Sequence, residues 1–182
     1  MHSIQSLRPN VSRAAAVEQM GANGVLRLLR WATAGPLRSI AEVYVPFHLF
    51  RVTIDSGAGR QEKLLAIDAV SGNFDLYAFD EIPASQQLIR VSTRNRPAAV
   101  LDVEGARELL VERLRRLVFR VGFFRVRRLR IEAEPLDIEL HVPYWVGLSG
   151  FGQRAHLTII DGVRRRVEGG KIRAFFRQWL AS

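Results

Sequence analysis

Two histidine–aspartate pairs are the residues of this chain whose types and spacing could perform chemistry. His48 precedes Asp68 by the same interval by which His141 precedes Asp161, and a glycine-containing turn lies midway in each interval. A hairpin centred on Ala58 or Phe151 would set each imidazole directly across from its carboxylate. Such a pair can orient a general base or form half of a metal site. The alternative is structural, because Asp also ends strands and starts turns.

Both pairs belong to a repeated stretch of sequence. Residues 56–70 read SGAGRQEKLLAIDAV and residues 149–163 read SGFGQRAHLTIIDGV, with Ser-Gly-x-Gly and the later Asp in the same register. An alignment without gaps matches His48 to His141. An alignment with a gap instead matches Val45-Pro46-Phe47 to Val142-Pro143-Tyr144 and places Trp145 opposite His48. The repetition indicates an internal duplication.

The first repeat is expected within residues 1–80, after an N-terminal tail that includes His2. Ser12 can cap a helix, and turn residues separate three extended segments. The segments are Val43–Ile54, Leu64–Asp68 and Phe74–Phe79. Residues 81–101 are predicted to be a connector with a short strand at Leu88–Val91.

The second repeat is expected within residues 102–182. A helix capped by Asp102 precedes a strand that ends at Pro135, the strands Ile138–Leu148 and Leu157–Asp161, and a final helix after Gly169-Gly170. We therefore predict an α+β fold in which tandem duplicated αβββ units form one antiparallel sheet of about six strands with helices packed on one face.

A short motif resembles a known family. Ala66-Ile67-Asp68-Ala69-Val70-Ser71-Gly72 is similar to the turn that ends PepSY-type repeats, which are small domains with one helix on an antiparallel sheet. The resemblance covers about seven residues, and the second copy matches it only in part. It implies a non-catalytic binding or inhibitory module.

The two proline-containing strands carry an unusual second face. Side chains alternate along a strand, so one face of each has an ordinary apolar pattern. The other face is rich in aromatic rings and imidazoles, which favours burial under the final helix, a second copy of the chain or a ligand. We predict an interaction surface made of Tyr44, His48, Phe50, His141 and Trp145.

A cluster of arginines supplies candidate anion contacts. These are Arg113, Arg116, Arg120, Arg127, Arg128 and Arg130. One interpretation is a solvated helix face. A second is a nucleic-acid surface with Phe119, Phe123 or Phe124 available for stacking. A third places the basic final helix, with Trp179, on an anionic membrane.

Composition narrows the function. The formal charge is +9. The chain has no cysteine, and this absence excludes disulfides, zinc–thiolate sites and thiol nucleophiles. The sequence predicts a cytoplasmic, non-enzymatic interaction or ligand-binding domain that forms a homodimer, with no cofactor, metal or catalytic residue. The alternatives are a nucleic-acid-binding accessory protein that uses the arginine cluster and a small enzyme or metal site that uses the His–Asp pairs.

Overall fold

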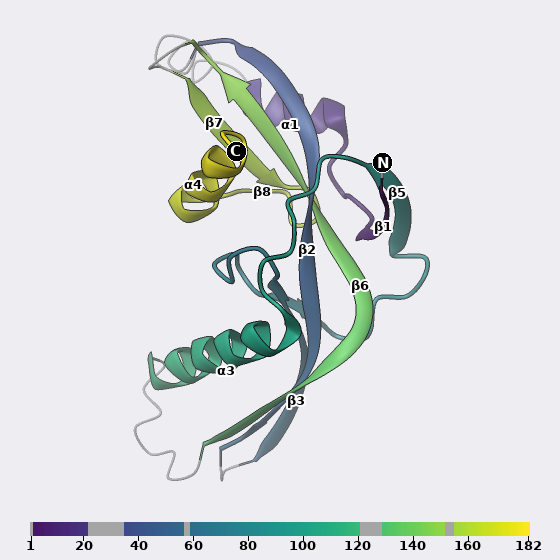
Figure 1. Ribbon diagram of the computed structural model, residues 1–182, viewed down its shortest axis with the longest axis vertical. Coiled ribbons are helices and arrows are strands. Elements are labelled where there is room, and N and C mark those ends of the chain that lie inside the picture. The colour runs from purple at the N-terminus through teal and green to yellow at the C-terminus, as the bar shows by residue number, and fades with distance from the viewer. Residues whose placement is uncertain (1, 22–34, 57–58, 121–128, 152–154) are drawn as a thin grey trace. The chain divides into compact units, whose positions relative to one another are not determined.

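A computed structural model describes residues 2–21, 35–56, 59–120, 129–151 and 155–182, and most of its regular structure is strand (Figure 1). The elements in chain order are β1 (His2–Leu7), α1 (Arg13–Gly21), β2 (Leu37–Asp55), β3 (Arg60–Asp68), β4 (Tyr77–Phe79), β5 (Leu88–Thr93), α3 (Val103–Arg120), β6 (Arg130–Ser149), β7 (His156–Asp161), β8 (Arg166–Val167) and α4 (Gly170–Trp179). The predicted helices after Ser12, Asp102 and Gly170 and the short strand near Leu88 are present, but the strands differ in part from the prediction. The strands β1 and β8 were not predicted, and β6 spans the two strands expected on either side of Pro135. No helix in the described part of the chain is long and apolar enough to span a membrane.

The described strands form one sheet. Six lie in the order β4-β3-β2-β6-β1-β5, and β7 and β8 continue from β6. The pairs β2–β3, β3–β4, β6–β7, β7–β8 and β1–β5 are antiparallel. The prediction of a purely antiparallel sheet is wrong, because β1 pairs in parallel with β6 where Ser6 meets His141. The expected N-terminal tail is therefore a strand of the sheet.

The chain forms two compact units, which are described separately. Unit 1 comprises residues 1–45, 87–97 and 141–182, and unit 2 comprises residues 46–86 and 98–140. The long strands β2 and β6 each contribute residues to both units. The units are thus discontinuous in sequence, and the boundaries at residues 80 and 102, which follow the sequence repeats, stay a prediction.

The core of unit 2 lies between its strands and α3. Phe50 and Val52 of β2 pack with Leu65 and Ile67 of β3, against Ala106, Leu110 and Leu114 of α3. The helix begins where predicted, because Asp102 Oδ1 accepts a hydrogen bond of 2.8 Å from the Gly105 N–H. Burial of this apolar helix stripe against the sheet holds α3 in place.

In unit 1 the helices lie on opposite faces of the strands. Trp145 of β6 packs with Ala16 and Met20 of α1. Its neighbour Tyr144 contacts Phe176 of α4, with ring centroids 5.9 Å apart. Successive side chains of a strand point to opposite faces, so α1 and α4 cover different faces. The expectation that all helices pack on one face is therefore wrong for this unit.

Proline does not end the first strand after α3 in the second repeat. Pro135 lies inside β6, which runs without a break from Arg130 to Ser149. The fixed φ of proline is compatible with extended backbone, so its cost to a strand is the missing N–H. The predicted strand end at Pro135 is wrong for this reason.

Gly72 provides a test of the turn between β3 and β4. Its φ is +66°, and a Cβ there would lie 2.8 Å from Leu109 Cδ1. We expect Gly72→Ala to lower the free energy of unfolding by about 1–3 kcal/mol, through left-handed strain and this clash. Urea denaturation measures the change. Gly59→Ala, where a Cβ meets nothing within 4 Å, is the matched control. Equal stabilities of the two variants would contradict the prediction.

Candidate functional site

The predicted His–Asp pairs do not form. Asp68 lies opposite Phe47, and His48 lies opposite Ile67. In the second hairpin, Asp161 lies opposite Tyr144. A displacement of one residue is enough to put His48 and Asp68 on opposite faces of the sheet. The ungapped alignment is therefore wrong as a guide to pairing.

Asp68 instead organises the turn that follows β3. It is fully buried, and its Oδ1 accepts hydrogen bonds from the backbone N–H groups of Ser71 (2.7 Å) and Gly72 (2.9 Å). Its Oδ2 accepts a bond of 2.8 Å from the Phe74 N–H. Arg113 of α3 binds the carbonyl oxygens of the same turn, with Nη1 2.7 Å from Gly72 O and 2.8 Å from Phe74 O. The Asp68 carboxylate thus accepts hydrogen bonds from the N–H groups of the turn, and the Arg113 guanidinium donates hydrogen bonds to its carbonyl oxygens.

Asp161 has the corresponding place in the second hairpin. It is also fully buried, and its Oδ1 accepts hydrogen bonds from Val163 N–H (2.9 Å) and Arg164 N–H (2.8 Å). The residue after each aspartate donates to the proline carbonyl of the partner strand. Ala69 N lies 2.8 Å from Pro46 O, and Gly162 N lies 2.9 Å from Pro143 O. These bonds agree with the gapped alignment, in which Pro46 matches Pro143.

The two histidines hold backbone carbonyl groups. His48 is half-buried, with Nε2 3.0 Å from Leu101 O. His141 is buried, with Nδ1 3.1 Å from Gln5 O. A carbonyl oxygen only accepts, so each of these ring nitrogens carries a proton. The imidazoles thereby attach the segment before α3 and the strand β1 to the sheet.

The remaining residues of the predicted interaction surface are covered by their own unit. Phe50 is in the core beneath α3. Trp145 is buried beside α1, and its Nε1–H donates to Val11 O at 2.9 Å. Tyr44 is also buried. Segments of the same unit thus cover Phe50 and Trp145, because α3 packs on Phe50 and α1 with Val11 packs on Trp145. A role in binding or dimerisation stays a prediction.

Glu42 and Tyr44 form a polar pair in unit 1. Both side chains lie on the same face of β2, and Glu42 Oε1 is buried without a hydrogen-bond partner. Burial raises the pKa of the Glu42 carboxyl, against the lowering effect of a hydrogen bond with Tyr44. Burial, and then the hydrogen bond and charge of Glu42, raise the pKa of the Tyr44 hydroxyl. Burial therefore favours the neutral form of Glu42, and the hydrogen bond with Tyr44 opposes this effect.

The predicted arginine cluster is only in part described, and that part is engaged within the chain. Arg113 binds the turn, Arg116 pairs with Glu112, and Arg130 Nε lies 2.8 Å from Glu132 Oε1. Arg127, Arg128, Phe123 and Phe124 lie outside the described residues, as do the side chains of Arg120 and Phe119.

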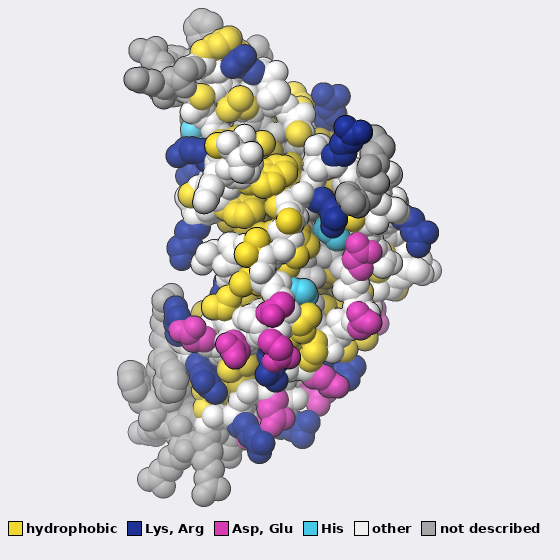
Figure 2. All heavy atoms as spheres, viewed as in Figure 1, with side chains coloured by type: hydrophobic (Ala, Val, Ile, Leu, Met, Phe, Trp, Pro, Cys, Tyr) yellow, Lys and Arg dark blue, Asp and Glu magenta, His cyan; other side chains and the backbone are white. Residues whose placement is uncertain are grey.

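The net positive charge of the described residues lies in unit 1, and the sequence analysis did not predict this division. Among the described residues, unit 1 holds 12 Lys and Arg against 4 Asp and Glu, whereas unit 2 holds 9 against 14. The corresponding formal charges are +8 and −5. Figure 2 shows acidic side chains gathered over α3 and the neighbouring strands, where Lys and Arg side chains also lie, whereas the Lys and Arg side chains around α1, α4 and β7 have few acidic neighbours in this view. The charge difference between the units cannot be read along the sequence, because three separate stretches of the chain make up unit 1.

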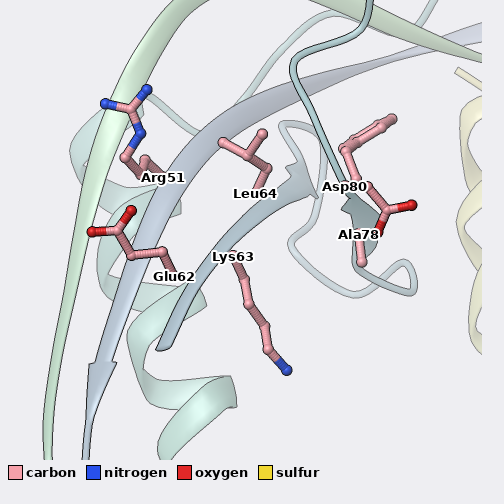
Figure 3. A pocket seen from close by; sticks show the side chains of 7 residues that line it. Arg51, Glu62, Lys63, Leu64, Ala78 and Asp80 are labelled. Carbon is pink, nitrogen blue, oxygen red and sulfur yellow. The ribbon is translucent and has the colours of Figure 1, made fainter. Parts of the chain in front are cut away.

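A pocket of about 560 Å³ lies on the strands of unit 2 (Figure 3). Arg51, Leu64 and Phe79 occupy paired positions of β2, β3 and β4 and so share one face of the sheet, opposite the α3 core. Lys63 extends away from Arg51 and Leu64 (Figure 3). Arg51 and Lys63 are balanced by Glu62 and Asp80. The lining therefore has no net charge with which to select an ion.

Within the described ranges, no three His, Cys, Asp or Glu side chains come together as metal ligands would. Comparison with known proteins finds no family model, no curated protein and no solved structure that matches the chain. The similarity to PepSY-type repeats stays a prediction.

Asp68→Asn tests the structural role of the buried carboxylate. The amide cannot accept at both ends, so its NH2 group would face either the Phe74 N–H or the pair of donors from Ser71 and Gly72. We expect the free energy of unfolding to fall by about 2–3 kcal/mol, as for other lost hydrogen bonds to a buried charge. Chemical denaturation measures it, and Asp137→Asn at an exposed position of β6 is the control. An unchanged midpoint for Asp68→Asn would refute this role.

Glu42→Gln tests the cost of the buried acid. The pKa of Glu42 is about 4.5 in the unfolded chain and higher in the folded protein. The folded protein therefore loses stability as the pH rises from the unfolded pKa to the folded pKa. We therefore expect the variant to be more stable than the wild type at pH 7, with the advantage shrinking toward pH 4. Thermal unfolding across this pH range measures it. Glu108→Gln, at an exposed position of α3, should show no such pattern.

Proposed function

We propose that the protein is a non-enzymatic binding protein that engages nucleic acid through the exposed Lys and Arg residues of unit 1. The observation that carries the proposal is the separation of charge, with +8 on the described part of unit 1 and −5 on that of unit 2. A concentrated positive field attracts polyanions and releases their counterions on contact.

Of the four described acidic residues of unit 1, only Glu18 is exposed. Asp161 and Glu168 are buried, and Glu42 is half-buried. Many bases of the unit are exposed, among them Arg13, Arg38, Arg90, Arg94, Arg165, Lys171 and Arg177. The charged side chains at the surface of unit 1 are therefore mostly Lys and Arg.

Nucleic acid is favoured over an anionic membrane because of how α4 packs. A membrane-surface helix presents its apolar side to lipid. In α4, Ile172 and Phe176 are buried in unit 1, and Phe176 contacts Tyr144. Phe175 and Trp179 are half-buried, and Leu180 just beyond the helix is exposed. Most of the apolar side of α4 is thus engaged in the core.

The arrangement of His48, His141, Asp68 and Asp161 supports binding over catalysis. All four side chains hold backbone groups of turns or neighbouring segments. The equivalent places of Asp68 and Asp161 in two hairpins also support an origin by duplication of one βββ scaffold, in line with the PepSY-type resemblance. A homodimer, which would double the positive surface, is part of this proposal.

The test is affinity for a labelled oligonucleotide across a salt series. We expect binding at low salt that weakens steeply as salt rises. The triple variant Arg165→Gln, Lys171→Gln, Arg177→Gln should bind about tenfold more weakly at low salt, with a salt slope flatter by up to about 2. Fluorescence anisotropy measures both quantities.

The matched control removes the same charge from unit 2, with Arg107→Gln, Arg115→Gln and Arg116→Gln. This triple should retain affinity. A loss confined to it would instead favour the predicted arginine cluster on α3. Absence of binding to any oligonucleotide at low salt, together with binding to phosphatidylserine vesicles, would replace nucleic acid with a membrane.

A further inference from the structure

An exposed aromatic ring stands at the end of β6 in unit 1. Phe151 follows Ser149 and Gly150, and 65 % of its surface is exposed. A large apolar side chain so far from the core contributes little to folding. Phe151 belongs to unit 1, which carries the net positive charge.

A cation lies over this ring. The guanidinium carbon of Arg38, from β2, is 4.2 Å from the ring centroid of Phe151. This cation–π contact lies at the outer surface, since Arg38 is also exposed. The two side chains together offer a flat π surface and a positive charge within one contact distance.

The backbone holds the pair in place. Gly150 N–H donates to Pro36 O at 3.1 Å. A Cβ on Gly35 would lie 3.0 Å from the Gly150 Cα, so the two segments approach as closely as glycine allows. Both glycines have φ of +72°. The segments that carry Arg38 and Phe151 are thus fixed to each other, which lowers the entropy cost of presenting the pair to a ligand.

We infer that Phe151 and Arg38 form a stacking site for an unpaired base, which makes single-stranded nucleic acid the preferred ligand. Bases of any sequence have a π face, and aromatic rings and guanidinium planes both stack on it. Arg38 can also contact the phosphate beside the stacked base. In a duplex the bases stack on each other, so no base face is free to stack on Phe151. The inference rests on the proposed function and adds strand preference to it.

The experiment compares three probes: an unstructured oligothymidylate, a duplex of equal charge, and heparin, which is a polyanion without bases. We expect Phe151→Ala to weaken oligothymidylate binding by about 5- to 100-fold. Heparin and duplex binding should change less than twofold. Phe151→Trp should retain or improve oligothymidylate binding, and thermal unfolding should show that both variants keep wild-type stability.

The outcomes separate the two proposals. If Phe151→Ala leaves oligothymidylate affinity unchanged, or weakens heparin equally, the stacking site is refuted while nucleic-acid binding by unit 1 stands. If the wild type prefers the duplex, strand preference is refuted. If the wild type binds none of the three probes at low salt, the proposed function fails and the stacking site fails with it.

Discussion

The described hairpins depend on a buried aspartate at the end of an inner strand. Asp68 and Asp161 have no exposed surface, and each binds the backbone N–H groups of the turn that follows. Leaving these donors unpaired in the interior would cost more than the bonds themselves contribute. The aspartates therefore fix where β3 and β7 stop and which way the chain turns. In unit 2, Arg113 completes the arrangement by joining the carbonyl oxygens of the turn to α3.

This constraint explains the use made of the polar residues near the turns. His48 lies on β2, which pairs with β3, and His141 lies on β6, which pairs with β7. Each histidine binds a backbone carbonyl group. Polar side chains that hold the chain together are not available to a substrate. Binding is then left to the surface, and the surface of the described residues is divided by charge between two units. On the proposed function, the ligand is selected by the positive charge of unit 1 and by the contacts of Phe151 and Arg38.

Local sequence signals predicted the elements well. Asp102 marked the start of α3, and the apolar spacing of Ile172 and Phe176 marked α4. Register was beyond reach, because a displacement of one residue separates His48 from Asp68 and no local signal sets the exact pairing. The sequence placed Trp145 on a face that something should cover, but the packing of α1 on that face was missed because no local signal says which segment covers it. The basic surface was missed because charge was counted along the chain, while the fold collects residues from three distant stretches.

The discontinuous course of the chain has a consequence for biosynthesis. All residues of unit 2 lie between positions 46 and 140, whereas unit 1 also needs β7 and α4, which the ribosome makes later. The acidic half of the protein can thus fold during translation, while the early segments β1 and α1 must wait for their partners. The basic surface of unit 1 is therefore completed only after β7 and α4 have been made.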